Sequence, residues 1–146
     1  RSTDGGIHWH DISAVLRGAA WTSISSIAVN PENPNLVVVG FRGGWTVKVM
    51  SAMIDPIGKF NWEDISTGLP ADADVNCLEF ALVNGGMELF AGTHQGVFRM
   101  PHFRENWQSY NGDMPPVLIT GLKYEIHSGT LVAGSHGAGV WMTHIR

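Results

Sequence analysis

Short runs of apolar residues follow one another along this chain, and clusters of turn-forming residues separate them. The runs that are almost purely apolar or β-branched are Leu36–Val39, Glu88–Ala91 and Leu131–Ala133. Such runs are typical of strands that are buried on both faces. The one stretch with a helical period, Asp11–Leu16, is too short to matter. The pattern therefore predicts an all-β fold.

The apolar runs recur in three aligned segments, and an internal repeat of this kind bears directly on the fold class. The segments are Ile24–Val49, Val75–Met100 and Val117–Thr143. A tryptophan stands before each segment, and these residues, Trp9, Trp62 and Trp107, are 53 and 45 positions apart. About four strands within a period of this length predict the blades of a β-propeller, each a sheet of four antiparallel strands.

The order of the runs assigns the strands within each blade. The expected innermost strands are Ser26–Val29, Asn76–Phe80 and Ile119–Leu122. The expected third strands are Trp45–Val49, Val97–Arg99 and Val140–Thr143, and each outermost strand begins at a tryptophan. We expect a single domain over 1–146, with an outermost strand in 1–13, blades in 22–66 and 75–111, and a blade lacking its outermost strand in 117–146.

A turn motif opens the chain, Ser2-Thr3-Asp4-Gly5-Gly6-Ile7-His8-Trp9. The Asp4 carboxylate is expected to accept hydrogen bonds from turn amides, and Gly6 permits a positive φ. The indole of Trp9 starts the next strand and is able to cover the turn. Ser2, Asp4, Gly6 and Trp9 are therefore expected to be structural.

This motif, Ser-x-Asp-x-Gly-x-x-Trp, together with the strand repeat, resembles the Asp-box or BNR-repeat propellers. That superfamily includes sialidases, xyloglucan-degrading hydrolases, sortilin-type receptors and a photosystem assembly factor. Only the first box is intact, because the residues before Trp62 keep one Asp and one Gly and those before Trp107 keep neither. The resemblance implies the fold and leaves the function open.

Three blades are too few for a closed ring, since known propellers have about four to eight. Alone they would expose two flat apolar faces. Two arrangements remain open: two copies forming a six-bladed ring, or a partial propeller whose other blades lie in a longer polypeptide. In either case, residues 1 to about 13 are expected to pair with the strand ending near Ile145, in this molecule or another.

Composition narrows the possible partners of this 146-residue chain. Its net charge is −4 with only 9 Lys and Arg residues and no basic run, which makes nucleic acid an unexpected partner. No apolar stretch approaches about 18 residues, so no membrane span is expected. Cys77 is the single cysteine, and its strand context predicts a buried, inert thiol. We expect no cofactor, and an extracytoplasmic or secreted location.

Candidate ligand residues fall in the turns after the second strands. Arg42, His94 and His136 hold equivalent places there, two residues after a glycine, on the face where propellers usually bind ligands. The alternative is that they are ordinary hydrogen-bonded turn residues. Two histidines without a third ligand do not indicate a metal site. Trp21, in a long loop, is the best candidate for an exposed sugar-stacking residue.

The blade-linking loops carry Asp72, Asp74 and Asp113. Glycoside hydrolysis needs two carboxylates about 5 to 9.5 Å apart, and Asp72 or Asp74 with Asp113 is a weak candidate pair. Loop aspartates more often cap turns. The arginine triad and the tyrosine of sialidases have no counterpart in this chain.

The sequence thus favours a non-catalytic propeller scaffold or binding module for a protein or glycan partner. One alternative is part of a secreted glycoside hydrolase whose catalytic residues lie largely outside this chain. A second alternative is an assembly factor for a larger complex.

Overall fold

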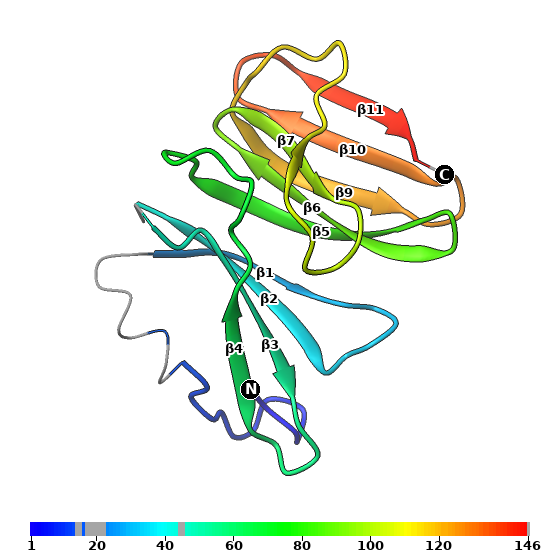
Figure 1. Cartoon of the computed structure of the whole chain (residues 1–146). Coiled ribbons are helices and arrows are strands. Elements are labelled where there is room, and N and C mark those ends of the chain that lie inside the picture. Colours follow the sequence, from blue (N-terminus) through cyan, green and yellow to red (C-terminus); the bar gives the residue numbers. More distant parts are fainter. Residues whose placement is uncertain (14–15, 17–22, 44–45, 146) are drawn as a thin grey trace.

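The computed structural model describes residues 1–13, 16, 23–43 and 46–145, and almost all of the regular structure is β (Figure 1). The strands form three antiparallel sheets, each ordered as in the chain. The first sheet holds β1 (Ser23–Val29), β2 (Leu36–Arg42), β3 (Val49–Ile54) and β4 (Phe60–Asp64). The second sheet holds β5 (Val75–Val83), β6 (Gly86–Thr93), β7 (Gly96–Met100) and β8 (Gln108–Ser109). The third sheet holds β9 (Ile119–Glu125), β10 (Thr130–Ser135) and β11 (Val140–His144), and the predicted all-β fold of blade-like sheets is confirmed.

The three sheets share one strand register. In each, a glycine of the second strand pairs with the first strand just beyond a bulge: Gly40 with Ser26, Gly92 with Cys77, and Gly134 with Gly121. We call positions that match under this alignment equivalent.

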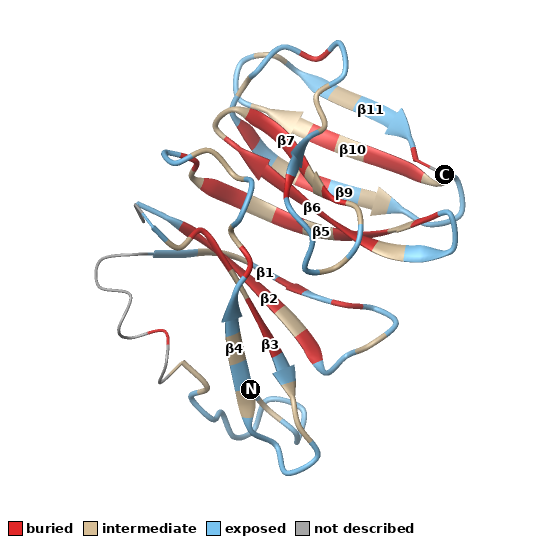
Figure 2. Ribbon diagram, in the orientation of Figure 1, coloured by how far each residue is buried: buried red, intermediate tan, exposed pale blue. Residues whose placement is uncertain are grey.

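The sheets pack in chain order, and two apolar cores join them. β5 packs against β1 and β2, and β9 packs against β5 and β6. Figure 2 shows that the buried residues concentrate on β2, β5, β6 and β10, where sheet meets sheet. The glycine register explains the close approach, because a Cβ on Gly40 would lie 2.6 Å from Val75 and one on Gly92 would lie 2.6 Å from Ile119.

Two strand expectations differ from the structure. The third strand of the first sheet is Val49–Ile54 instead of Trp45–Val49, because Val49 pairs with Gly40 and so fixes the register; Trp45 lies outside the described residues. Residues 1–13 form no strand, and their expected pairing with the strand ending near Ile145 does not exist within the chain. The N-terminus lies beside the first sheet, and β11 is the edge strand of the third sheet (Figure 1). The stack of sheets therefore separates the N-terminal segment from β11. Pairing with another molecule stays a prediction.

Within the described ranges, no helix is long and apolar enough to cross a membrane.

Candidate functional site

The turn that opens the chain is held by its own polar side chains. Asp4 Oδ1 accepts the hydroxyl proton of Ser2 at 2.8 Å and the amide of His8 at 3.0 Å, and the amide of Gly6 donates to Ser2 Oγ at 2.9 Å. These bonds, those from His8 above all, lower the pKa of the Asp4 carboxyl to about 2. The indole of Trp9 donates to Gly6 O at 3.0 Å. Because these groups hydrogen-bond to one another, they stabilise the turn itself.

A polar network lies where β2 ends and β5 begins. Arg42 Nε donates to Asn76 Oδ1 at 2.6 Å, and Asn76 Nδ2 donates to Ile119 O at 3.0 Å. This relay connects all three sheets at one end of the stack. Arg42 is itself exposed, and a guanidinium has further N–H donors beyond Nε. We call this end of the stack, where β2 ends and β5 begins, the rim. These hydrogen bonds therefore hold Arg42 at the rim with donor groups still facing solvent.

The same rim carries two of the three candidate aspartates. Asp74 Oδ1 accepts the amide of Gly43 at 2.7 Å, and the amide of Asp74 donates to His94 Nδ1 at 3.2 Å. Asp72 Oδ1 accepts a bond from Gln95 Nε2 at 2.9 Å. The segment before β5 thus joins the turn after β2 to the turn between β6 and β7.

The imidazole of His94 is oriented by this arrangement. A backbone amide only donates, so Nδ1 is the unprotonated nitrogen and the ring proton sits on Nε2 in the neutral form. Nε2 lies 3.7 Å from Asp72 Oδ2 and 3.2 Å from Gln95 Nε2. His94 and Gln95 are half-buried and Asp72 is exposed, so two neighbouring donors, His94 Nε2 and Gln95 Nε2, face the Asp72 carboxylate at an accessible surface.

The remaining predicted ligand residues stand apart from this rim network. His136 is exposed, and its backbone amide donates to Leu118 O at 2.8 Å. Trp21 lies outside the described residues. Sequence reasoning missed Asn76 and Gln95; Asn76 sits within an apolar strand pattern, and no spacing signal marks either residue.

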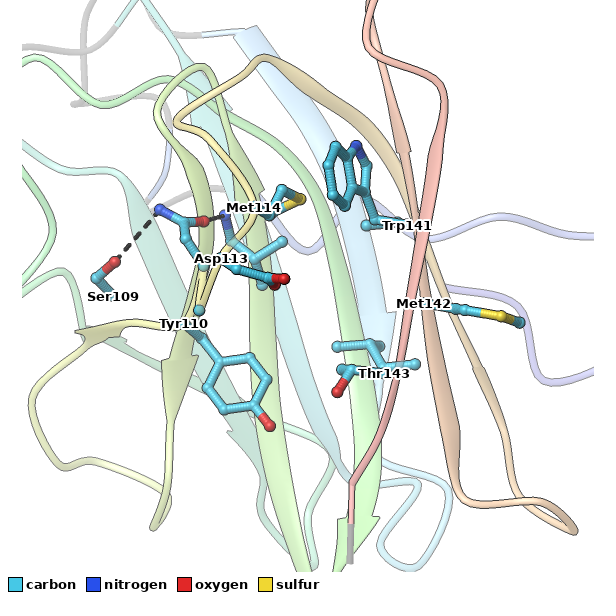
Figure 3. A pocket seen from close by; sticks show the side chains of 12 residues that line it. Ser109, Tyr110, Asp113, Met114, Trp141, Met142 and Thr143 are labelled. Atoms are coloured by element: carbon cyan, nitrogen blue, oxygen red, sulfur yellow. Dashed lines mark hydrogen bonds between the residues drawn. The ribbon is translucent and has the colours of Figure 1, made fainter.

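Asp113 lies elsewhere, beside a pocket of about 390 Å³ between the second and third sheets. Figure 3 shows Tyr110 and Asp113 on one side of this pocket and Trp141 and Thr143 on the other. Neither Asp72 nor Asp74 lines it. The candidate pairing of Asp113 with either aspartate thus has no shared site within the described residues.

A second feature that sequence reasoning missed is an ion pair between two neighbouring strands of the second sheet. Glu88 is buried and receives both Nε and Nη2 of Arg99, the latter at 2.7 Å. The carboxylate of Glu88 raises the pKa of Arg99, and the guanidinium lies 5.4 Å from the ring centre of Tyr110. The contact is structural, because it bridges β6 and β7 within the interface.

Among the residues that the structure describes, no group of three or more His, Cys, Asp or Glu side chains is placed to hold a metal ion. Burial raises the pKa of the Cys77 thiol to about 11, which disfavours the nucleophilic thiolate. Comparison of the sequence with family profiles and with curated proteins gives no match.

Proposed function

We propose that this chain is a non-catalytic binding module of the Asp-box propeller type, whose polar rim receives a hydroxyl-rich ligand, a glycan above all. The observation that carries the proposal is the rim network, which fixes Arg42, Asp72, His94 and Gln95 at one end of the stack. Donors and acceptors that lie next to one another in hydrogen-bonded turns suit neighbouring hydroxyl groups, and such groups fix the orientation of a ligand.

The hydrogen bonding also supports binding over catalysis. Asp72 and Asp74 each accept a bond from a neighbouring group, and Asp113 lines a separate pocket. An acid and a base acting on one glycosidic bond would need two carboxyl groups on the same site. The described rim offers Asp72 and Asp74 only two positions apart, on one short segment.

A glycan array probed with the tagged protein tests the proposal. Arg42→Ala and His94→Ala are expected to abolish the signal, because the first removes exposed donors and the second removes a fixed imidazole. His102→Ala is the matched control, since His102 is exposed in the turn between β7 and β8 and is expected to leave binding unchanged.

Three results would contradict the proposal. Binding that survives both rim substitutions places the ligand elsewhere. Hydrolysis of a bound glycan that is lost in Asp72→Ala identifies a hydrolase instead. Absence of glycan binding, with capture of a protein that Arg42→Ala abolishes, assigns the rim to a protein partner.

A further inference from the structure

A pocket of about 490 Å³ lies between the opening turn and the hairpin that joins β3 to β4. Figure 1 shows the opening turn beside this hairpin. The lining residues that matter here are Arg1, His10 and Asp11 on one side and Lys59, Phe60 and Trp62 on the other. We call this the outer pocket. It shares no residue with the rim.

The lining of the outer pocket is rich in positive charge. Arg1, His10 and Lys59 are exposed and line it. Among the residues that the structure describes, no acidic side chain forms an ion pair with any of the three. The lining contains the Asp11 carboxylate, whose Oδ1 accepts both the amide of Ser13, at 2.8 Å, and its hydroxyl. Basic side chains therefore outnumber acidic ones around the pocket.

The interface between the first and second sheets has the same pattern of contacts and allows a comparison. Trp107 donates from its indole to Ile65 O at 2.7 Å. Trp62 donates in the same way to Ile12 O at 3.1 Å, across the outer pocket. Ile65 and Ile12 each lie three residues after a tryptophan. Positions counted from the tryptophans therefore correspond between the two places.

In the interface between the first and second sheets, an ion pair occupies the corresponding place. Glu63 lies one residue after Trp62. Arg104 lies three residues before Trp107, and its Nη2 is 3.0 Å from Glu63 Oε2. Phe103, the residue before Arg104, is half-buried and packs against the core. A carboxylate and a phenyl ring thus complete this interface.

The outer pocket has basic residues at both positions of that ion pair. His10 lies one residue after Trp9, and Lys59 lies three residues before Trp62. The residue before Lys59 is Gly58, where the other interface has a phenylalanine. Two basic side chains do not neutralise each other, and a glycine leaves the space that a phenyl ring would fill. An anion bound here would supply the negative charge that the other interface takes from a glutamate.

Aromatic rings provide the apolar part of the lining. Phe60 and Trp62 are half-buried, and their rings stack with centres 6.4 Å apart and an interplanar angle of 20°. The hydrogen bond from the Trp62 indole fixes the orientation of that ring. The face of an aromatic ring carries partial negative charge and packs well against C–H groups. This surface suits a ligand that joins an anionic group to a ring with an apolar face, as an acidic sugar does.

The backbone on both sides of the outer pocket is held by hydrogen bonds. Asp55 Oδ1 accepts the amide of Lys59 at 2.8 Å, and the amide of Asp55 donates to Lys59 O at 3.0 Å. The amide of His10 donates to Arg1 O at 2.8 Å. Because these main-chain positions are fixed before a ligand arrives, only side chains have to be ordered on binding.

We propose that the outer pocket binds an acidic sugar residue, with its carboxylate or sulfate group held by Lys59 and His10 and its ring lying on Phe60. Hydrogen bonds from cationic side chains to an oxyanion are among the strong ones in proteins. A pocket of about 490 Å³ is within the usual size of small-molecule sites. This site is additional to the rim and does not depend on glycan binding there.

An NMR titration of the ¹⁵N-labelled full chain tests the proposal. The probes are methyl glucuronide, which carries a carboxylate, methyl glucoside 6-sulfate, and uncharged methyl glucoside as the matched sugar. At least one acidic sugar is expected to shift the amide signals of His10, Lys59 and Phe60, and the uncharged sugar is expected to leave them in place. A response to only one of the two acids supports the site and identifies its anionic group.

Side-chain substitutions separate the two parts of the site. Lys59→Gln is expected to weaken binding about tenfold, because it removes a charge-assisted hydrogen bond. Phe60→Leu keeps the position apolar and is expected to weaken binding of the acidic sugar, with little effect on inorganic sulfate. Lys123→Gln is the matched control, since Lys123 is an exposed lysine of β9 outside the pocket, and it is expected to bind like the wild type. Circular dichroism checks the fold of each variant.

Lys59→Glu keeps the test decisive if the other variants lose stability. Its carboxylate would lie near His10 and Arg1 and restore the pairing of opposite charges that Glu63 and Arg104 show in the other interface. The variant is expected to resist urea at least as well as the wild type and to lose binding of acidic sugars.

Four results would overturn the proposal. The first is the absence of any shift at the pocket with both acidic sugars. The second is an equal response to the uncharged sugar, which would exclude recognition of charge. The third is inorganic sulfate binding as tightly as the sulfated sugar, which would leave a simple anion site. The fourth is acidic-sugar binding that survives in folded Lys59→Glu.

Discussion

Alanine at the register glycine is expected to destabilise the second sheet and to leave the third sheet intact. Neither Gly92 nor Gly134 has a positive φ, so alanine is compatible with the backbone at both. The two positions are equivalent and differ in what faces them. A Cβ on Gly92 would lie 2.4 Å from Cys77 Sγ and 2.6 Å from Ile119 Cγ2, whereas on Gly134 the nearest atom is 3.8 Å away.

The magnitude follows from these distances. Ordinary contacts to a Cβ are 3.4 to 4 Å, so Gly92→Ala requires the third sheet to move by about 1 Å. Overpacking of this kind costs about 1–3 kcal/mol, and the reduced entropy of the unfolded chain offsets about 0.4–1 kcal/mol. A net loss of about 1–2 kcal/mol is expected. Gly134→Ala meets no such overlap and is expected to gain about 0.4–1 kcal/mol.

Urea unfolding of both variants, followed by fluorescence and circular dichroism, measures the difference. The work is best done at the lowest usable protein concentration, because association of two copies would add stability. A fall in the midpoint for Gly92→Ala with an unchanged slope is the expected result. Equal midpoints for the two variants under these conditions would refute the reasoning.

Three further predictions concern single side chains. Hydrogen bonds from His8 hold the pKa of the Asp4 carboxyl at about 2, below its ordinary 3.8. The carboxylate therefore stabilises the turn fully above pH 3.8 and loses this role as the pH falls through about 2. An NMR titration of the His8 amide measures the midpoint, and a value near 3.8 would contradict the prediction. Burial raises the pKa of Cys77 to about 11, so a thiol reagent is expected to label the native chain far more slowly than the unfolded chain at mildly alkaline pH. Equal labelling rates would show that the thiol is accessible. Glu88→Ala leaves the partly exposed Arg99 guanidinium without its carboxylate and is expected to cost about 1–2 kcal/mol in urea unfolding, whereas the double substitution to Met at both positions is expected to be nearly neutral. Equal losses in the single and double variants would contradict this account of the pair.

The repeat was visible in the sequence because strand periodicity is local. The apolar runs at 36–39, 88–91 and 131–133 each lie within the second strand of their sheet. The position of the third strand in the first sheet was predicted wrongly. Several adjacent runs there are apolar enough to form a strand, and only the pairing of Val49 with Gly40 selects Val49–Ile54.

The residues at the rim were predicted only in part, because spacing along the chain is local and contacts between distant segments are not. Equivalent spacing after the register glycines placed Arg42 and His94 at one end of the stack, and the structure connects Arg42 to Asn76 at the start of β5 and His94 to Asp74 just before β5. It does not add His136, because no following sheet within the described chain supplies a partner for that turn. Asn76 contributes through hydrogen bonds to the two neighbouring sheets, and Gln95 through a bond to Asp72, 23 residues earlier, and no local pattern records either contact.

The sequence by itself determined the strand class, the repeat and the opening turn, because alternation, glycine placement and an Asp-containing turn act over a few residues. Only the tertiary structure decided which faces are covered. Val97 and Val140 have the same place in the repeat, yet the first is buried and the second is exposed, because burial depends on a neighbouring sheet and not on the residue itself. The same reason makes Trp107 a core residue and leaves Trp9 open to solvent.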